Sequence, residues 1–364
     1  MSTPLVQPRR TRRRLSSTVI VYLALIGVII IGAILVSTVG RSFFSAGNIR
    51  DILTGMSVLG LVAVGQTFVI LCGSLDLSVP YVVSLSSLLA ADIMAGSPTM
   101  ILPGVAVALG VAAVIGLVNG LVVTKLKVHG FIATLGMGLI VKGYLDTNYK
   151  GTSGSVPWEF QIIGATGIGP VPLSTILMLL IAALGAFLLA RTRIGNHMFA
   201  VGGNEQVARL SGIRTSRPVI VAHMLSSVMA ACAGLLLASR LGVGSPTVGP
   251  QGGYDLLSIA AVVLGGTILA GGRGSIWGTI GGVAIFAVLD NVMSVLQVNP
   301  FLKDVVRGVV IIAAVAVYAG RQIEQRRQRF SEGPPAPVLP PASVSAPPAS
   351  AAYAEALPTT EDRA

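Results

Sequence analysis

Runs of apolar residues long enough to cross a membrane recur through most of this chain, and they constrain its fold more than any other feature. The first run, Ser17–Val39, exceeds the ~20 apolar residues that a membrane-spanning helix needs. Charged residues make up only 11% of the 364, whereas a soluble domain carries roughly 25%, so the chain cannot cover itself with a water-compatible surface. Because backbone polar groups must be bonded internally in lipid, the pattern predicts an all-α polytopic membrane protein.

Ten such segments are predicted, and together they form a transmembrane domain over residues 17–320. The segments are 17–39, 48–72, 79–96, 100–123, 131–148, 173–190, 217–240, 254–271, 275–297 and 302–320. The third is short and the fifth is interrupted by charge, so totals from about eight to about eleven fit the pattern.

The basic residues predict the orientation of these segments. With a cytoplasmic N-terminus, ten helices place seventeen Lys and Arg on the inner side and five on the outer side. Both tails are then cytoplasmic: a basic tail, 1–16, and a second, 321–364, that is basic at first and then rich in Pro and Ala and disordered. The net charge of +11 is therefore a topology signal and does not indicate a partner nucleic acid.

The longest polar interruption between apolar segments is the stretch 191–217. Asn204, after two glycines, is placed to cap a short helix in which Glu205 and Arg209 form an ion pair four residues apart. Val207 and Leu210 share one face, and Gly212 ends the helix. A helix of about two turns is marginal in water by itself, so we expect it to lie against a partner outside the membrane. A plain connecting loop with arginines reaching to the lipid interface is the competing interpretation.

A second polar stretch, 71–80, ends one apolar segment and opens the next. Asp76 lies there between a glycine and a proline, and it fits a helix cap that accepts N–H groups around Ser78. An ionisable residue at membrane depth is also a candidate substrate or proton site. Gln66, Asn119 and Asn291 are further polar side chains in apolar segments, either lining a substrate pathway or bonding neighbouring helices.

Glycines predict where helices approach closely. Gly274, Gly278 and Gly282 are spaced by four residues, as are Gly116 and Gly120. Residues 61–79 and 259–277 also resemble each other weakly, so an internal repeat is one reading of the chain.

Motifs for catalysis are missing from the sequence. It contains no phosphate-binding loop, no zinc-protease motif, no paired-cysteine motif and no nucleophile elbow, and its two cysteines and three histidines form no ligand cluster. We therefore expect a non-catalytic protein without metal or cofactor, driven by an external energy source.

Several ordered motifs resemble one family. TRIGNHMFAVGGNEQVARLSGI (192–213) is similar to the cytoplasmic loop of permease subunits of bacterial ATP-binding-cassette (ABC) importers of monosaccharides, the ribose, xylose and galactose type. GSLDLSVP (73–80), KVHGFIATLGMGLIVKG (127–143) and GYDLLSIAAVVLGGTILAGGRGSIWGT (253–279) resemble the same family. The resemblance covers about residues 19–320.

The resemblance implies a multi-pass permease in the bacterial inner (plasma) membrane. It implies three partners besides lipid: a cytoplasmic ABC ATPase, an extracytoplasmic sugar-binding protein, and a second permease copy or paralogue. Residues Gly203–Ile213 would be the coupling helix that seats in a groove of the ATPase. Two departures from the family affect the pathway and the outer face: Pro80 replaces the usual glycine, and 142–160 differs from the usual version.

Two other functions stay open on the sequence. An ABC permease for another small solute, such as a polyol, nucleoside or branched-chain amino acid, would differ in its binding protein. An ion-coupled secondary transporter would use Asp76 or Asp146 as its proton site and would survive loss of ATP.

Overall fold

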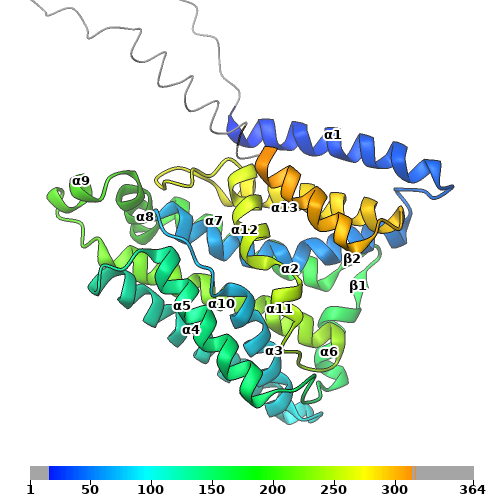
Figure 1. The fold of residues 1–364 in the computed structure, drawn as a ribbon, viewed down its shortest axis with the longest axis horizontal. Helices are drawn as coiled ribbons and strands as arrows, with labels where there is room; N and C mark the ends of the chain where they lie inside the picture. The colour runs from blue at the N-terminus through cyan, green and yellow to red at the C-terminus, as the bar shows by residue number, and fades with distance from the viewer. Residues whose placement is uncertain (1–15, 314–315, 317–364) are drawn as a thin grey trace, which may run out of the picture. The chain divides into compact units, whose positions relative to one another are not determined.

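The computed structural model describes residues 16–313 and 316, and most of these residues are helical (Figure 1). Two short strands, β1 (Gly167–Ile168) and β2 (Val171–Pro172), form an antiparallel pair. The predicted all-α class of a polytopic membrane protein is confirmed. The predicted tails 1–16 and 321–364 lie outside the described residues, except for Ser16.

Each predicted segment contains a helix. These are α1 (Ser17–Thr38), α2 (Ala46–Leu71), α3 (Val79–Met94), α4 (Ile101–Lys125), α5 (Gly130–Asn148), α7 (Leu173–Arg191), α10 (Ser216–Leu241), α12 (Tyr254–Leu264), α13 (Ile276–Val295) and a helix over 300–313. Within 16–313, six helices are long and apolar enough to span a membrane: α1, α2, α4 with the 3-10 turn before it, α7, α10 and α13. Shorter helices connect them: η1 (Pro98–Met100), α6 (Trp158–Ala165), α8 (Arg193–Gly203), α9 (Glu205–Leu210) and α11 (Val248–Gln251).

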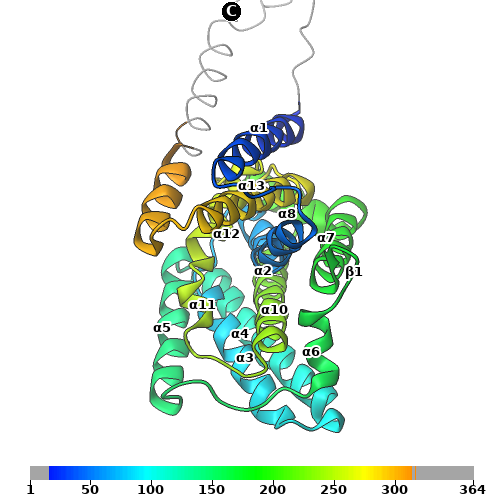
Figure 2. The same cartoon turned by 90° about the vertical axis from the view of Figure 1, so that its right-hand side faces the viewer.

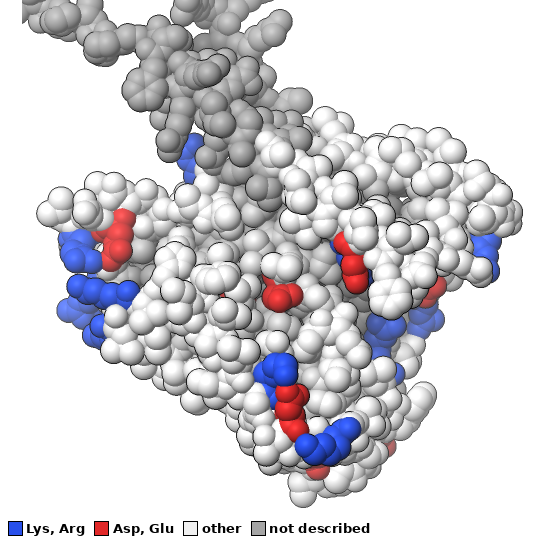
Figure 3. All heavy atoms as spheres, in the orientation of Figure 1, with Lys and Arg blue, Asp and Glu red and all other residues white. Residues whose placement is uncertain are grey.

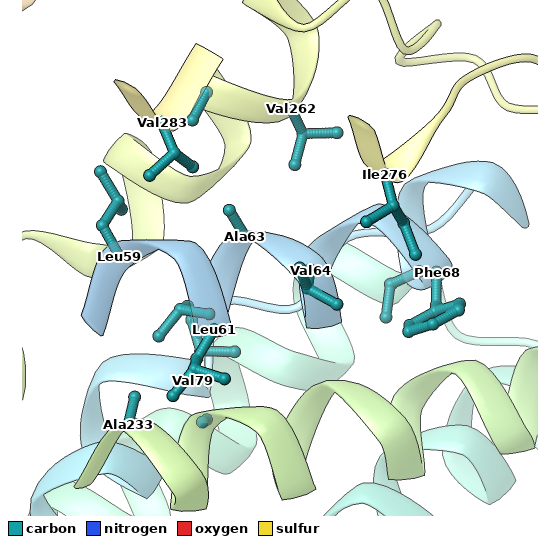
Figure 4. Close-up of a cluster of buried hydrophobic side chains, with 14 of the residues drawn as sticks. Leu59, Leu61, Ala63, Val64, Phe68, Val79, Ala233, Val262, Ile276 and Val283 are labelled. Atoms are coloured by element: carbon teal, nitrogen blue, oxygen red, sulfur yellow. The ribbon is translucent and has the colours of Figure 1, made fainter. Parts of the chain in front are cut away.

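Helix α2 forms the centre of the bundle. All sixteen residues from Met56 to Leu71 are buried, which requires neighbours on every side of the helix. Helices α10, α13, α12 and α7 supply them, and Figures 1 and 2 show α2 running among these helices. Figure 4 shows the resulting apolar cluster, in which Val64 and Phe68 of α2 lie near Ile276 of α13.

The peripheral helices present apolar surface outward instead. Helix α1 packs against α13 and leaves Leu23, Ile30 and Ile34 more than half exposed. Helices α4, α5 and α7 likewise expose large apolar side chains, among them Ile140 and Phe187. Exposed apolar residues of this extent suit contact with lipid or with another membrane subunit rather than with water.

The predicted small-residue contacts are confirmed. A side chain at Gly278 or Gly282 of α13 would come within 2.1 Å of a backbone carbonyl of α12 or of the turn that follows it. At Gly116 of α4, a Cβ would lie 2.5 Å from the carbonyl oxygen of His223 on α10. These glycines let the helix backbones touch. In lipid the hydrophobic effect does not drive helices together, so van der Waals packing at close range stabilises their association instead.

One predicted boundary is wrong. The segment expected over 254–271 is helical only to Leu264, because Gly265 and Gly266 interrupt it and Gly266 has a left-handed φ of 89°. Residues 265–275 then form turns before α13 begins. A second interruption, predicted at 71–80, separates α2 from α3. The two weakly similar stretches of the sequence thus both contain a helix that ends at glycines.

Candidate functional site

The polar stretch 191–217 folds as two helices in series. Thr192 caps α8, its hydroxyl oxygen accepting a hydrogen bond from the Gly195 backbone N–H at 3.2 Å. Asn204 ends α8 and caps α9, its side-chain oxygen accepting from the Val207 N–H at 3.0 Å. The predicted cap at Asn204 is confirmed, whereas α8 was not predicted. Its signal was Thr192 followed by Ile194, Met198 and Val201 at helical spacing.

The short helix α9 has the predicted internal contacts. Arg209 donates to Glu205 at 2.6 Å, and the Thr215 hydroxyl donates to the same Glu205 oxygen at 3.1 Å. Gly212 has φ 80°, and the next N–H, that of Ile213, donates back to the Ala208 carbonyl at 3.0 Å. This pattern is a Schellman C-cap, in which glycine takes the left-handed position without a Cβ penalty. Capped at both ends, a helix of six residues keeps its shape.

The outer face of α9 has no covering in the described part of the chain. Val207 is 57% exposed and Leu210 is 88% exposed, whereas Ala208 between them is buried against the bundle. Charged Glu205 and Arg209 flank these apolar side chains. An exposed apolar pair framed by charges on a rigid helix is a surface that another protein can cover.

Helices α8 and α9, joined at Asn204 and called here the α8–α9 hairpin, pack at Gly202 against the end of α2 and against the turns that follow α12. The contact consists of Leu71, Gly73, Gly202, Gly271 and Gly272, named here the glycine junction. The Gly272 N–H donates to the Leu71 carbonyl at 3.0 Å. A Cβ at Gly202 would lie 1.8 Å from that same carbonyl oxygen and 2.6 Å from the Gly272 nitrogen. Three backbones therefore touch without any side chain between them.

The break between α2 and α3 is held by buried polar groups. The Ser78 backbone N–H and hydroxyl both donate to Asp76 Oδ1, at 3.0 and 2.6 Å. Asn119 of α4 donates to the Ser78 hydroxyl at 3.0 Å. With its amide nitrogen facing the Asp76 carbonyl, Gln66 makes two hydrogen bonds of 3.2 Å to the Asp76 backbone. The predicted capping role of Asp76 is confirmed at Ser78.

Three of the four predicted pathway residues thus come together in one network. Gln66, Asp76 and Asn119 are each at most 1% exposed. Gln66 bonds the backbone of the break and Asn119 bonds the Ser78 hydroxyl, while Asp76 Oδ2 is buried without a hydrogen-bond partner among the described residues. Thr134 of α5 adds to this network by accepting the Leu77 N–H at 3.0 Å. Asn291 lies apart, near the opposite end of α2, against a different cavity.

A basic cavity opens beside the glycine junction. Its volume is about 960 Å³, and it lies among the ends of α2 and α4, the start of α10, and the α8–α9 hairpin. Lys125, Lys127, Arg214 and Arg217 line it, together with the Glu205–Arg209 pair. Figure 3 shows Lys and Arg gathered at this end of the molecule, beside α8 and α9, and separate groups of charged residues of both signs elsewhere on the same face. These are the residues that the positive-inside rule assigns to the cytoplasmic side.

Comparison with known proteins gives one family. The family described as "Branched-chain amino acid transport system / permease component" matches residues 48–315, from the start of α2 to the helix over 300–313. The ribose import permease protein of Escherichia coli (strain K12) is 39% identical over 299 residues, covering 81% of this chain and 92% of that protein. That of Bacillus subtilis (strain 168) is 39% identical over 288 residues, covering 78% and 88%.

A relative with another substrate is also similar. The L-arabinose transport system permease protein of Escherichia coli (strain K12) is 35% identical over 272 residues, covering 74% of this chain and 81% of that protein. No solved structure matches the chain. The matched range 48–315 contains the α8–α9 hairpin, the α2–α3 break and the glycine junction.

Proposed function

Since this chain belongs to the permease-component family of the branched-chain amino acid transport system, we propose that it is the membrane permease subunit of an ABC importer of a monosaccharide. The observation that carries the sugar assignment is the 39% identity to ribose permeases across 92% of their length. The chain is then a multi-pass protein of a bacterial inner membrane and a non-catalytic part of its complex.

We propose ten membrane helices with both chain ends in the cytoplasm. The ten helical segments support the number of membrane helices. The basic cavity supports the orientation, because this cavity lies at the end of α2 beside the glycine junction and then faces the cytoplasm. The domain division is unchanged from the sequence: a basic tail over 1–16, a transmembrane domain over 17–320, and a basic, Pro- and Ala-rich tail over 321–364. Residues 191–217 are the cytoplasmic coupling loop.

The partners follow from the apparatus of an ABC importer. A cytoplasmic ABC ATPase covers α9, with Val207 and Leu210 in its groove and Glu205 and Arg209 at the rim. Gly203, Asn204 and Gly212 fix the helix for that contact. An extracytoplasmic sugar-binding protein docks on the opposite face, and a second permease copy or paralogue completes the pathway.

Mechanically, the glycine junction supports a direct connection between the ATPase and the membrane interior. When the ATPases close on ATP, α9 moves with them, and α8 presses on the Leu71 carbonyl and the 270–272 turn. Since all residues of α2 from Met56 to Leu71 are buried, a displacement at the end of this helix reaches the α2–α3 break held by Asp76, Gln66 and Asn119. We propose that these residues keep the break in one of two packings during alternating access.

Uptake driven by ATP tests this function. Cells that contain the complete importer are given labelled D-ribose, D-xylose and L-arabinose, with and without this chain. We expect ATP-dependent uptake of at least one of these sugars that survives an uncoupler, together with co-purification of an ABC ATPase in mild detergent. Uptake that survives ATP depletion and collapses with an uncoupler would instead identify an ion-coupled transporter, with Asp76 or Asp146 as the site to examine.

A further inference from the structure

A second cavity lies at the opposite end of α2 from the glycine junction. Its volume is about 560 Å³, and we name it the outer pocket. It is bounded by the start of α2, the end of α10, α12, α13 and the helix over 300–313. In the described part of the chain, no residue lines both this pocket and the basic cavity.

The inner wall of the outer pocket is built from polar side chains with defined partners. The Arg307 Nε and Nη2 atoms donate to the two carboxylate oxygens of Asp290, at 2.9 and 2.7 Å. This bidentate pair is partly buried, with 23% of the arginine side chain and 42% of the aspartate side chain exposed. Asn291, next along α13, has its Oδ1 atom buried without a hydrogen-bond partner among the described residues. A buried acceptor without a partner is costly, and Asn291 lines the pocket, so a rotation of its side chain that brings Oδ1 to a ligand donor would satisfy it.

Apolar groups form the remaining wall. Tyr254 and Leu257 of α12 and Phe286 of α13 line the pocket beside the polar groups. A pocket of this kind combines hydrogen-bonding groups with an aromatic surface, so it suits a ring that carries hydroxyls at its edge and C–H groups on its face.

We propose that the outer pocket is the site that receives the sugar from the binding protein, with Asn291 Oδ1 accepting a hydrogen bond that a sugar hydroxyl donates. This inference rests on the proposed function. A neutral aldose fits better than a zwitterionic amino acid, because Arg307 already bonds both carboxylate oxygens of Asp290 and also donates to Asp304 at 3.0 Å, so these charges are engaged with one another and not with a charged ligand. The other charged groups, Arg41, Asp51 and Arg240, are exposed at the mouth. Hydrogen bonds, rather than ion pairs with the ligand, therefore determine which ligand binds at the inner wall.

Protection of an introduced cysteine tests the site. Ser294→Cys places a thiol on the pocket wall one turn beyond Asp290, and a membrane-impermeant maleimide is applied to the outside of right-side-out vesicles. The native Cys72 is buried and Cys232 is half-buried, so the wild-type chain measures the background labelling. D-ribose, D-xylose, L-arabinose and leucine are added separately, without binding protein. At twice its dissociation constant, a ligand that covers the thiol slows labelling about threefold.

We expect rapid labelling of Ser294→Cys and protection by at least one aldose. Adding Asn291→Leu, of similar volume, should abolish protection and leave labelling intact. Asn148→Leu is the matched control and should retain protection, because Asn148 is exposed at the end of α5 and bonds only the Tyr144 carbonyl. Elution as a single species in detergent shows that each variant is folded.

Several results would overturn the inference: no labelling, labelling that no aldose slows, protection by leucine alone, or protection that survives Asn291→Leu. The uptake assay runs in parallel and distinguishes a failure of the site assignment from a failure of the proposed function. If an aldose enters cells through this chain and still gives no protection, the site assignment fails and the proposed function stands. If no aldose enters, the function itself fails.

Discussion

Gly202→Ala is the change that tests most directly how ATP hydrolysis reaches the membrane interior. In the wild-type chain the position of its Cβ would be 1.8 Å from the Leu71 carbonyl oxygen, whereas real Cβ contacts are essentially never under 3.0 Å. The alanine methyl must therefore displace α8 from the end of α2 by at least about 1.2 Å. The two obstructing atoms, the Leu71 carbonyl oxygen and the Gly272 nitrogen, belong to backbone and cannot rotate away. Overpacking of this kind costs about 1–3 kcal/mol.

The expected result is an assembled but poorly coupled importer. Helix α9 is unchanged, so the ATPase should still co-purify, while sugar uptake falls and ATP hydrolysis no longer responds to the loaded binding protein. Both are measured on the complex in lipid nanodiscs or proteoliposomes. Gly110→Ala in α4, outside the coupling loop, is the control, because a Cβ there meets nothing within 4 Å and neither Gly110 nor Gly202 has a left-handed backbone. Equal uptake by the two variants would refute a coupling route through the glycine junction.

Three further predictions concern the other parts of the molecule. Leu210→Asp places a charge where the ATPase groove should be apolar, so ATPase recovered in a pull-down should fall roughly tenfold or more, as expected for losing about 1.5–3 kcal/mol of burial; full recovery would contradict the docking of α9. Asn119→Leu leaves Ser78 without its buried donor, which costs about 1–3 kcal/mol and should lower the apparent melting temperature in detergent; an unchanged melting curve would show that the break does not need this bond. Deletion of 333–364 should leave the initial uptake rate nearly unchanged, and a transport-dead truncation would mean that the tail contacts the ATPase.

Local features of the site could be predicted from the sequence because they depend on residues within one helical turn. Asn204 and Gly212 signal a cap and an end by their chemistry, and Glu205 reaches Arg209 by helical spacing alone. The segments of the bundle were predictable for a similar reason, since each apolar run must form its own backbone hydrogen bonds in lipid.

The tertiary contacts that connect the α8–α9 hairpin to the membrane helices could not be predicted from the sequence in the same way. Leu71 and Gly272 are two hundred positions apart, and no periodicity relates them. The early end of α12 at Leu264 also depends on tertiary packing, because Gly265 lies against the Gly278 backbone of α13. Gln66, Asn119 and Asn291 look alike as polar residues in apolar segments, so only the fold places Gln66 and Asn119 in the buried network around Asp76 and places Asn291 beside a pocket.

The position of the two cavities indicates what the transport cycle must change. Leu59 lines the outer pocket and Cys72 lines the basic cavity, so about 20 Å of α2 separates them at 1.5 Å per residue. Every residue of α2 between those positions is buried, so a solute moving from one cavity to the other needs helices to repack around α2. Cys72 and Gly73 lie directly after the Leu71 carbonyl that α8 contacts. A force on α8 is therefore applied where α2 ends and the basic cavity begins, which is the place where a small displacement can open or close that cavity.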